Sequence, residues 1–250
     1  MHKKKQDKEQ KYYGIHACLG IFENRPSDII KLYIHESNLK TFGPLLKFCA
    51  KNKKAYKVVS NEDLEKVSSS VHHEGVCLVA KEPTAINFEE CLQSLKNPNI
   101  CLLYLDGVQN PHNIGSILRT CAHFGIPYIL GTSLPTLSPS ACRIAKGGAE
   151  TVRLVQLENP LKALKALKNL GFSFIGTSSH NQVSLYASKL PARTIFAFGS
   201  EASGMSEEMM RLASTNMQIP GTGAVESLNV SIAASLCIGE YSRQHPIKPC

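Results

Sequence analysis

The sequence lacks a long apolar run. No stretch of its 250 residues approaches the ~20 uninterrupted apolar residues that a membrane-spanning helix needs. The first ten residues contain four lysines and have no apolar core of the kind that a signal peptide carries. We therefore expect a soluble protein of the cytoplasm.

The sequence also lacks paired cysteines. Its nine cysteines are scattered, odd in number, and include no C-x-x-C pair. A disulfide framework or a zinc site needs clustered ligands, so we expect neither, and no metal. Most cysteines stand in apolar runs, as Cys49 does, and this setting is typical of buried, reduced thiols.

Three common enzyme signatures are missing. There is no Walker A pattern and no G-x-S-x-G elbow, which argues against a P-loop NTPase and an α/β-hydrolase. Gly221 and Gly223 resemble the start of a dinucleotide loop, but Glu226 stands where G-x-G-x-x-G requires its third glycine. A nucleotide-binding oxidoreductase is therefore disfavoured.

The composition is that of a basic globular protein. The hydrophobic fraction of 43% can bury substantial cores, and 250 residues suffice for two ordinary domains. The net charge of +8 and the pI of about 9.0 favour a polyanionic partner, although basicity alone is a weak indication.

The pattern of apolar residues predicts two α/β domains. A charged tail over 1–11 is expected to be disordered, and strands and helices then alternate over 12–81. Pro83 and polar neighbours indicate a linker over 82–97. The second domain spans 98–244, and its first strand is so uniformly apolar that we expect a buried parallel sheet. Residues 245–250 form a C-terminal tail.

Three polar, glycine-bearing segments follow strands of the second domain. They span 105–120, 198–204 and 219–231. We expect a helix from Asn113, with Asn113 as its cap, and a last helix from about Ser227 to Tyr241. Because ligands collect at the carboxyl ends of strands in open α/β sheets, these segments are candidates for a site. Each one alone is also compatible with an ordinary loop.

Together, the three segments closely resemble the motifs of SpoU/TrmH RNA methyltransferases, which belong to the SPOUT class. The matches are N-x-G-x-x-x-R (Asn113, Gly115, Arg119), G-x-E-x-x-G (Gly199, Glu201, Gly204), and an I-P pair followed by E-S-L-N-V-S between Ile219 and Ser231. This resemblance covers 98–244. A looser one over 12–81, which includes Tyr13 and His73, is to the L30-like substrate-binding domain often fused in front.

The resemblance implies a C-terminal deep trefoil knot and a homodimer with active sites near its interface. It also implies methyl transfer from S-adenosylmethionine to a ribose 2′-hydroxyl of structured RNA, with no metal. By motif position, the cofactor contacts are Thr177, Gly199, Ile219 and Leu228.

The same motif positions imply catalytic roles for Arg119, Glu201, Ser227 and Asn229. Arg119 could be the base, but a guanidinium with a pKa above ~12 rarely gives up its proton. It could instead bind the target phosphate and stabilise a developing alkoxide. The candidate RNA contacts are Asn113, Arg143 and Lys146, although a merely solvated face explains the last two equally well.

Two questions stay open from the sequence. The L30-like front domain favours ribosomal RNA as the substrate, with transfer RNA second, but fold-level analogy does not fix a substrate. The alternative function is a noncatalytic RNA-binding protein that keeps the fold. The presence of all four expected catalytic residues speaks against it.

Overall fold

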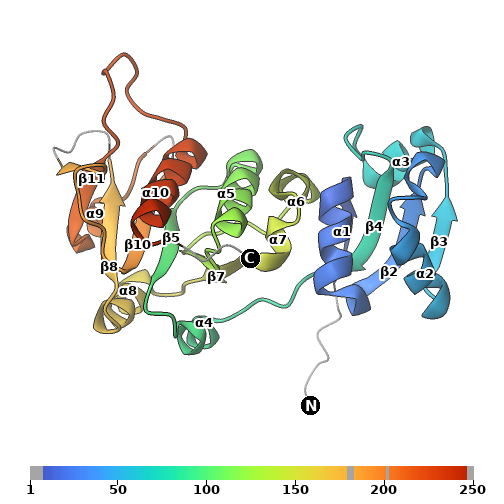
Figure 1. Ribbon diagram of the computed structural model, residues 1–250, viewed down its shortest axis with the longest axis horizontal. Coiled ribbons are helices and arrows are strands. Elements are labelled where there is room, and N and C mark those ends of the chain that lie inside the picture. The colour runs from blue at the N-terminus through green and yellow to red at the C-terminus, as the bar shows by residue number, and fades with distance from the viewer. Residues whose placement is uncertain (1–7, 179–182, 201–202, 247–250) are drawn as a thin grey trace. The chain divides into compact units, whose positions relative to one another are not determined.

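The computed structural model describes residues 8–178, 183–200 and 203–246, and its chain divides into two compact units (Figure 1). Unit 1 combines the described residues up to Thr84 with Leu137–Thr151. Unit 2 combines Ala85–Thr136 with the described residues from Val152 onward. The segment Leu137–Thr151 therefore groups with the N-terminal part of the chain, although the sequence placed it within 98–244.

Unit 1 is built on a four-stranded sheet in the order β1-β4-β2-β3. Its strands are β1 (Glu9–Tyr13), β2 (Ile29–Ile34), β3 (Ala55–Val58) and β4 (Val76–Lys81). Strands β1 and β2 both run antiparallel to β4, and β3 pairs in parallel with β2.

Strand β1 corrects the prediction that the disordered tail extends to residue 11. Glu9 pairs with Lys81 and Lys11 with Val79, so residues 9–11 belong to the sheet. The charged composition of residues 9–11 gave no sign of a strand. The two residues that follow, Tyr12 and Tyr13, are only 2% and 7% exposed. Burying two aromatic side chains stabilises the strand enough to order its polar start.

Three α-helices complete the N-terminal part of unit 1: α1 (Ile15–Asn24), α2 (Gly43–Lys51) and α3 (Asn61–Ser68). The short 3-10 turns Pro26–Asp28 and Glu36–Asn38 flank β2. Ser60 caps helix α3, because its hydroxyl accepts a hydrogen bond from the Asp63 N–H at 3.2 Å.

The segment Leu137–Thr151 carries α6 (Pro139–Ala145) and α7 (Gly148–Thr151), and it packs closely within unit 1. The Arg25 Nε lies 2.6 Å from the Glu150 Oε2, and these side chains are 10% and 5% exposed. A Cβ on Gly20 would lie 2.9 Å from the Gly147 Cα, so the two backbones approach closely. A buried ion pair and glycine contacts thus hold the segment.

Unit 2 is built on a seven-stranded sheet in the order β7-β6-β5-β10-β8-β11-β9, and all its pairs are parallel. This confirms the predicted parallel sheet. Its strands are β5 (Ile100–Asp106), β6 (Tyr128–Gly131), β7 (Arg153–Gln156), β8 (Ser173–Thr177), β9 (Val183–Ser184), β10 (Arg193–Gly199) and β11 (Thr215–Gln218). Strands β5 and β10 lie in the middle and are almost wholly buried.

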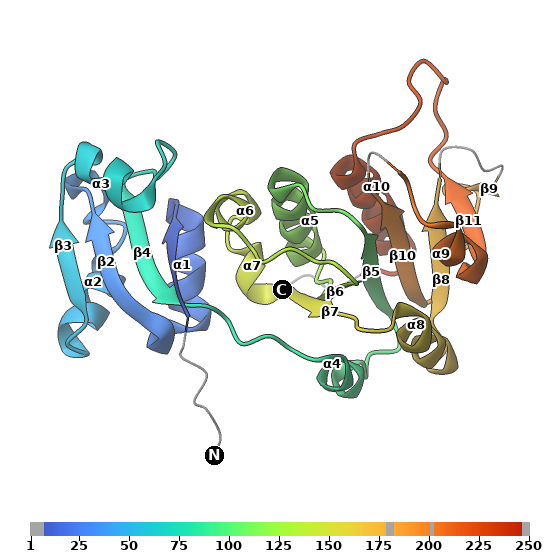
Figure 2. The ribbon, with the colours of Figure 1, turned by 180° about the vertical axis from the view of Figure 1, so that it is seen from behind.

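Helices cover both faces of this sheet (Figure 2). They are α4 (Phe88–Ser94), α5 (Pro111–His123), α8 (Pro160–Asn169), α9 (Glu207–Leu212) and α10 (Val230–Gln244). Residues of α4, α8 and α9 share one apolar core with β5 and β10. Helices α5 and α10 pack against each other.

Helix α4 lies inside the segment predicted as a linker over 82–97. Asn87 and Glu90 form a capping box, with hydrogen bonds of 2.8 and 3.0 Å between side chain and backbone N–H in each direction. Cys91 on its inner face is fully buried. A short capped helix therefore lies within the predicted linker.

The eight described cysteines are all buried as free thiols, as their apolar surroundings predicted. Burial raises the pKa of the Cys91 thiol to about 12. Among the described residues, no helix has the length and apolar character needed to cross a membrane.

Candidate functional site

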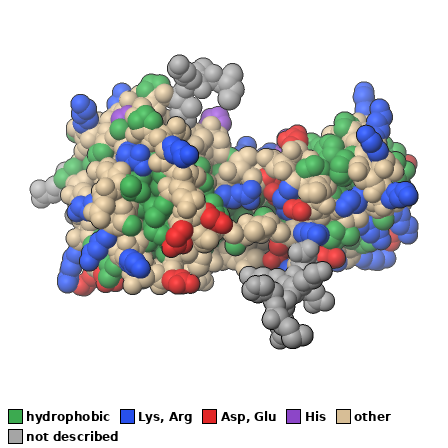
Figure 3. Space-filling model, turned by 90° about the horizontal axis from the view of Figure 1, so that it is seen from below, with side chains coloured by type: hydrophobic (Ala, Val, Ile, Leu, Met, Phe, Trp, Pro, Cys, Tyr) green, Lys and Arg blue, Asp and Glu red, His purple; other side chains and the backbone are tan. Residues whose placement is uncertain are grey.

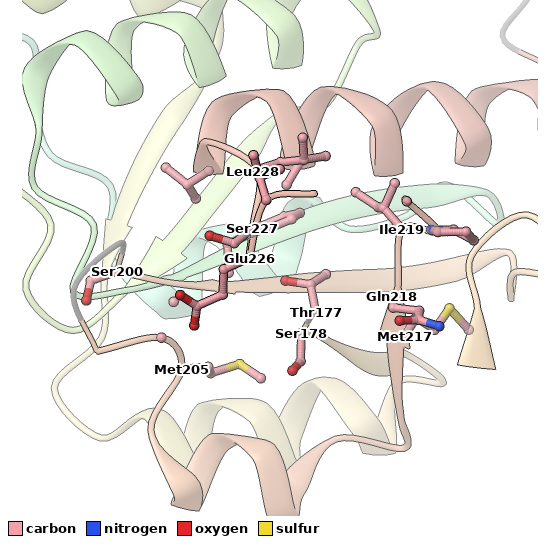
Figure 4. A pocket seen from close by; sticks show the side chains of 18 of the residues that line it. Thr177, Ser178, Ser200, Met205, Met217, Gln218, Ile219, Glu226, Ser227 and Leu228 are labelled. Carbon is pink, nitrogen blue, oxygen red and sulfur yellow. The ribbon is translucent and has the colours of Figure 1, made fainter. Parts of the chain in front are cut away.

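A pocket of about 760 Å³ lies at the carboxyl ends of β8, β10 and β11 (Figure 4). Its volume is in the range of small-molecule sites. Thr177 and Ser178 lie at the end of β8, Ser200 and Ser203–Met205 follow β10, and the connection from Ile219 to Leu228 follows β11. The second and third segments singled out in the sequence therefore face one cavity.

The loop after β10 makes a tight turn at Gly199. The Ser200 N–H donates to the Gly204 carbonyl at 3.1 Å, and the reverse bond is 2.9 Å. A Cβ on Gly199 would lie 1.9 Å from the Gly204 carbonyl carbon, so no other residue fits there. Gly204 has φ of +67°, which also favours glycine. Glu201, a predicted catalytic residue, lies outside the described residues.

Thr177 lines the pocket while its hydroxyl is already used. The Thr177 Oγ1 donates a hydrogen bond to the Ala197 carbonyl at 2.7 Å, which ties the end of β8 to β10. The Asp106 carboxylate at the end of β5 accepts from the Ser206 N–H at 2.8 Å. The first bond fixes the end of β8 at the pocket, and the second ties the residue before α9 to the end of β5.

The connection from β11 to α10 is exposed from Gly221 through Asn229. Predicted cofactor residues Ile219 and Leu228 line the pocket, and so does Ser227. The last helix begins at Val230, three residues later than the predicted start at Ser227. Asn229 is its cap and accepts from the Ser231 N–H at 2.9 Å, which keeps Ser227 and Leu228 in the loop.

Asn113 and Asn229 meet across α5 and α10. The Asn229 Nδ2 donates to the Asn113 Oδ1 at 3.0 Å, and Asn113 is 6% exposed. Asn113 is therefore not the cap of α5 that the sequence indicated. Asn110 is that cap, since its Oδ1 accepts from the His112 N–H at 2.9 Å. Asn113 and Asn229 were both predicted as site residues, but nothing in the sequence indicated that their side chains are hydrogen-bonded to each other.

Arg119 is exposed on α5 and is not among the residues that line the pocket. Within the described parts of the chain it forms no ion pair and no side-chain hydrogen bond. Its guanidinium is thus available to an anionic ligand.

The predicted RNA contacts Arg143 and Lys146 lie in unit 1, at the end of α6. The Arg143 Nη1 lies 3.7 Å from the Glu74 Oε1, and the aliphatic part of Arg143 packs on Gly14. Lys146 is exposed and ends α6 with φ of +47°. These two residues therefore belong to unit 1, whereas Asn113 belongs to unit 2.

Comparison with known families decides the classification. Residues 99–239 match the model of the SpoU rRNA Methylase family, which is more than half of the chain. The chain belongs to this family. Residues 12–85 match a second model, described as RNA 2′-O ribose methyltransferase substrate binding.

Similar proteins align along nearly the whole SpoU-family chain. It is 31% identical to the 23S rRNA (guanosine-2′-O-)-methyltransferase RlmB of Neisseria meningitidis serogroup B, covering 94% of this chain and 96% of that protein. It is 32% identical to the Uncharacterized tRNA/rRNA methyltransferase YfiF of Escherichia coli O157:H7, covering 97% of this chain and 70% of that protein.

Solved structures share the fold of this SpoU-family protein. The SpoU methyltransferase AviRb from Streptomyces viridochromogenes, in complex with AdoMet, superposes with a TM-score of 0.78 at 19% identity, covering 95% of this chain and 90% of that chain. The TrmH/SpoU tRNA modifying enzyme of A. aeolicus has a TM-score of 0.54 at 27% identity, covering 63% and 84%.

Proposed function

We propose that this protein transfers a methyl group from S-adenosylmethionine to a ribose 2′-hydroxyl of ribosomal RNA. One observation carries the proposal. Residues of the second and third motifs line a single pocket, and Asn229 of the third motif is hydrogen-bonded to Asn113 of the first. All three motifs thus contribute to one region of unit 2.

The residues of the pocket fit S-adenosylmethionine. Gly199 lets the backbone of Gly204 and Met205 pack directly against it, and this tight turn shapes one wall of the pocket. Met205, Ile219 and Leu228 offer apolar surface, while the exposed backbone between Gly221 and Leu228 offers polar groups. When bound, the cofactor supplies a methyl group that its sulfonium makes electrophilic, so the transfer itself requires no metal.

Arg119 would bind the RNA phosphate next to the reacting ribose. A guanidinium keeps its proton at neutral pH, so its contribution is electrostatic stabilisation of the developing alkoxide rather than proton removal. The hydrogen bond between Asn113 and Asn229 would hold the start of α10, and with it Ser227, at the edge of the pocket. A role for Glu201 in orienting these loops is part of the proposal.

Ribosomal RNA is favoured as the substrate because similarity to RlmB extends through both parts of the chain. The tRNA-modifying enzyme of A. aeolicus covers 63% of this chain. Unit 1 would be the RNA-binding unit, with Arg143 and Lys146 contacting the RNA backbone. On the face seen in Figure 3, lysines and arginines are spread widely, which suits contact with an extended polyanion.

Several expectations from the resemblance belong to this proposal. They are the deep trefoil knot, the homodimer, the absence of a metal and a cytoplasmic location. Transfer RNA is the second candidate substrate, supported by the A. aeolicus enzyme.

The test is methyl transfer from labelled S-adenosylmethionine to RNA from a strain that lacks the protein, offered as ribosomal subunits, free ribosomal RNA and transfer RNA. The wild type should label one ribosomal RNA, and Arg119→Ala should lower the rate ~1000-fold, as expected when a group stabilising transition-state charge is lost. Lys165→Ala, which removes an exposed cation from α8, should keep full activity. Labelling of transfer RNA alone would overturn the proposal of ribosomal RNA as the substrate. Failure of the protein to bind S-adenosylmethionine would overturn the proposed enzymatic activity.

A further inference from the structure

The described residues that line the pocket carry one negative charge. Of the described residues that line it, Glu226 is the one with an ionisable acidic or basic side chain, and the others are apolar, glycine or neutral polar. Figure 4 shows the Glu226 carboxylate extending into the cavity, on the side where Ser200 and Met205 lie. No ion pair joins Glu226 to another described residue, so its charge is uncompensated there.

The cofactor and its product differ in charge where the reaction occurs. S-adenosylmethionine carries a sulfonium, an ammonium and a carboxylate, and its net charge is +1. In the transfer, the ribose oxygen forms a bond to the methyl carbon and releases its proton to solvent. The S–CH₃ bond breaks, and its electron pair stays on sulfur as a neutral thioether. The product, S-adenosylhomocysteine, therefore has a net charge of zero.

We infer that Glu226 is a specificity-determining residue that makes the pocket bind S-adenosylmethionine in preference to S-adenosylhomocysteine. The inference rests on the proposed function and deepens it. A fixed carboxylate attracts the cationic cofactor more strongly than the product, which has lost the sulfonium charge, so methyl transfer weakens binding of the molecule left in the pocket. Such discrimination speeds product release and limits product inhibition.

The surroundings of Glu226 set the size of the effect. Methionines 205 and 217 and Ile219 line the same cavity and lower the local polarity, which strengthens the attraction. The Glu226 side chain is itself exposed, so water and salt screen its charge. We therefore expect about a tenfold contribution to the preference, equivalent to ~1.4 kcal/mol.

Calorimetric titration of the full chain tests the inference. The ligands are S-adenosylmethionine, S-adenosylhomocysteine and sinefungin, whose amine places a positive charge where the sulfonium stands. Glu226→Gln should weaken S-adenosylmethionine and sinefungin ~10-fold and S-adenosylhomocysteine less than ~2-fold. Glu226→Asp keeps the charge and should keep most of the preference. Glu208→Gln, which removes an exposed charge from α9 outside the pocket lining, is the matched control and should change neither.

Salt gives a second readout that a merely structural role would not move. Raising the salt concentration from about 0.05 M to about 0.5 M should reduce the preference of the wild type and leave that of Glu226→Gln unchanged. Equal weakening of all three ligands by Glu226→Gln would overturn the inference, and so would no change in any. If the wild type binds none of the ligands, the proposed function fails and the inference fails with it. If the wild type binds the ligands and Glu226→Gln leaves the ratio of their affinities unaltered, the inference is refuted but the proposed function is not.

Discussion

Two connections in the region matched by the SpoU family model have opposite characters. Leu137–Thr151, between β6 and β7, is held in unit 1 by a buried ion pair and a close glycine contact. The connection Ile219–Asn229, between β11 and α10, is largely exposed and lines the pocket. Matched buried polar groups fix a segment in one place. A segment with few buried side chains leaves its residues accessible to a ligand.

The largest effect should come from breaking the buried contact of the first connection. Glu150→Ala would leave the Arg25 guanidinium buried without its carboxylate and should lower the free energy of unfolding by ~3–5 kcal/mol. Burial alone would lower the pKa of Arg25, but the contact with Glu150 raises it by more, so the net shift is upward. Thermal or denaturant unfolding measures this.

The control for Glu150→Ala is an exposed pair of the same chemistry. Glu207 and Arg211 on α9 lie 3.0 Å apart, with side chains 89% and 80% exposed. Glu207→Ala should cost less than ~1 kcal/mol. Equal costs for the two variants would contradict the view that burial fixes Leu137–Thr151.

A smaller loss of stability, with a large loss of binding, should follow from Gly199→Ala. The new Cβ would collide with the Gly204 carbonyl carbon and the Met205 nitrogen, at 1.9 and 2.0 Å. Backbone must shift, at ~1–3 kcal/mol or more, and the pocket loses its shape. Calorimetry should detect no S-adenosylmethionine binding. Gly239→Ala on α10, where a Cβ meets nothing within 4 Å, should bind normally.

A moderate effect on activity should follow from separating the two asparagines. Asn113→Ala removes the oxygen that accepts from the Asn229 side chain and should cost ~1–2 kcal/mol, or roughly tenfold in kcat. The double variant Asn113→Ala/Asn229→Ala should lose less than the sum of the single variants. Full additivity in kcat would show that the pair does not act as a unit.

The smallest effect should be a pH dependence of stability that arises at the C-terminal end of α10, the helix that follows the exposed connection. Hydrogen bonds from Arg243 and Gln244 lower the pKa of Glu240 from 4.5 to about 2. A lowered folded-state pKa stabilises the protein above about pH 4.5, and this contribution is lost as the pH falls toward 2.

Because Arg243 is itself 69% exposed, the stabilisation by Glu240 should amount to only ~1 kcal/mol. The free energy of unfolding should therefore fall more steeply between pH 6 and pH 3 for the wild type than for Glu240→Gln. Parallel curves would argue against a native-state role for this ion pair.

Local rules predicted much of the fold. The nearly unbroken apolar run at the start of the second domain was enough to predict the parallel sheet. The rules misled where two candidates competed. Asn110 and Asn113 are both suited to a cap, and tertiary contact with Asn229 draws Asn113 into the interior instead.

Packing between distant segments could not be read from the sequence. Nothing local marks Glu150 as the partner of Arg25, so the grouping of Leu137–Thr151 with unit 1 was missed. The motifs did locate the pocket, because Thr177, Gly199, Ile219 and Leu228 all line it. The motifs gave no indication that Glu226 is the one charged residue among the described residues that line the pocket.

The central claim is the reaction itself, and nucleoside mass spectrometry of cellular RNA tests it most directly. Ribosomal and transfer RNA would be compared from a wild-type strain, a strain lacking the protein, and the latter strain expressing the wild type or Arg119→Ala. We predict that one 2′-O-methylated nucleoside disappears from ribosomal RNA in the deletion strain, returns with the wild type, and does not return with Arg119→Ala. A methyl group found on a base, or methylation unchanged in all four strains, would contradict the account.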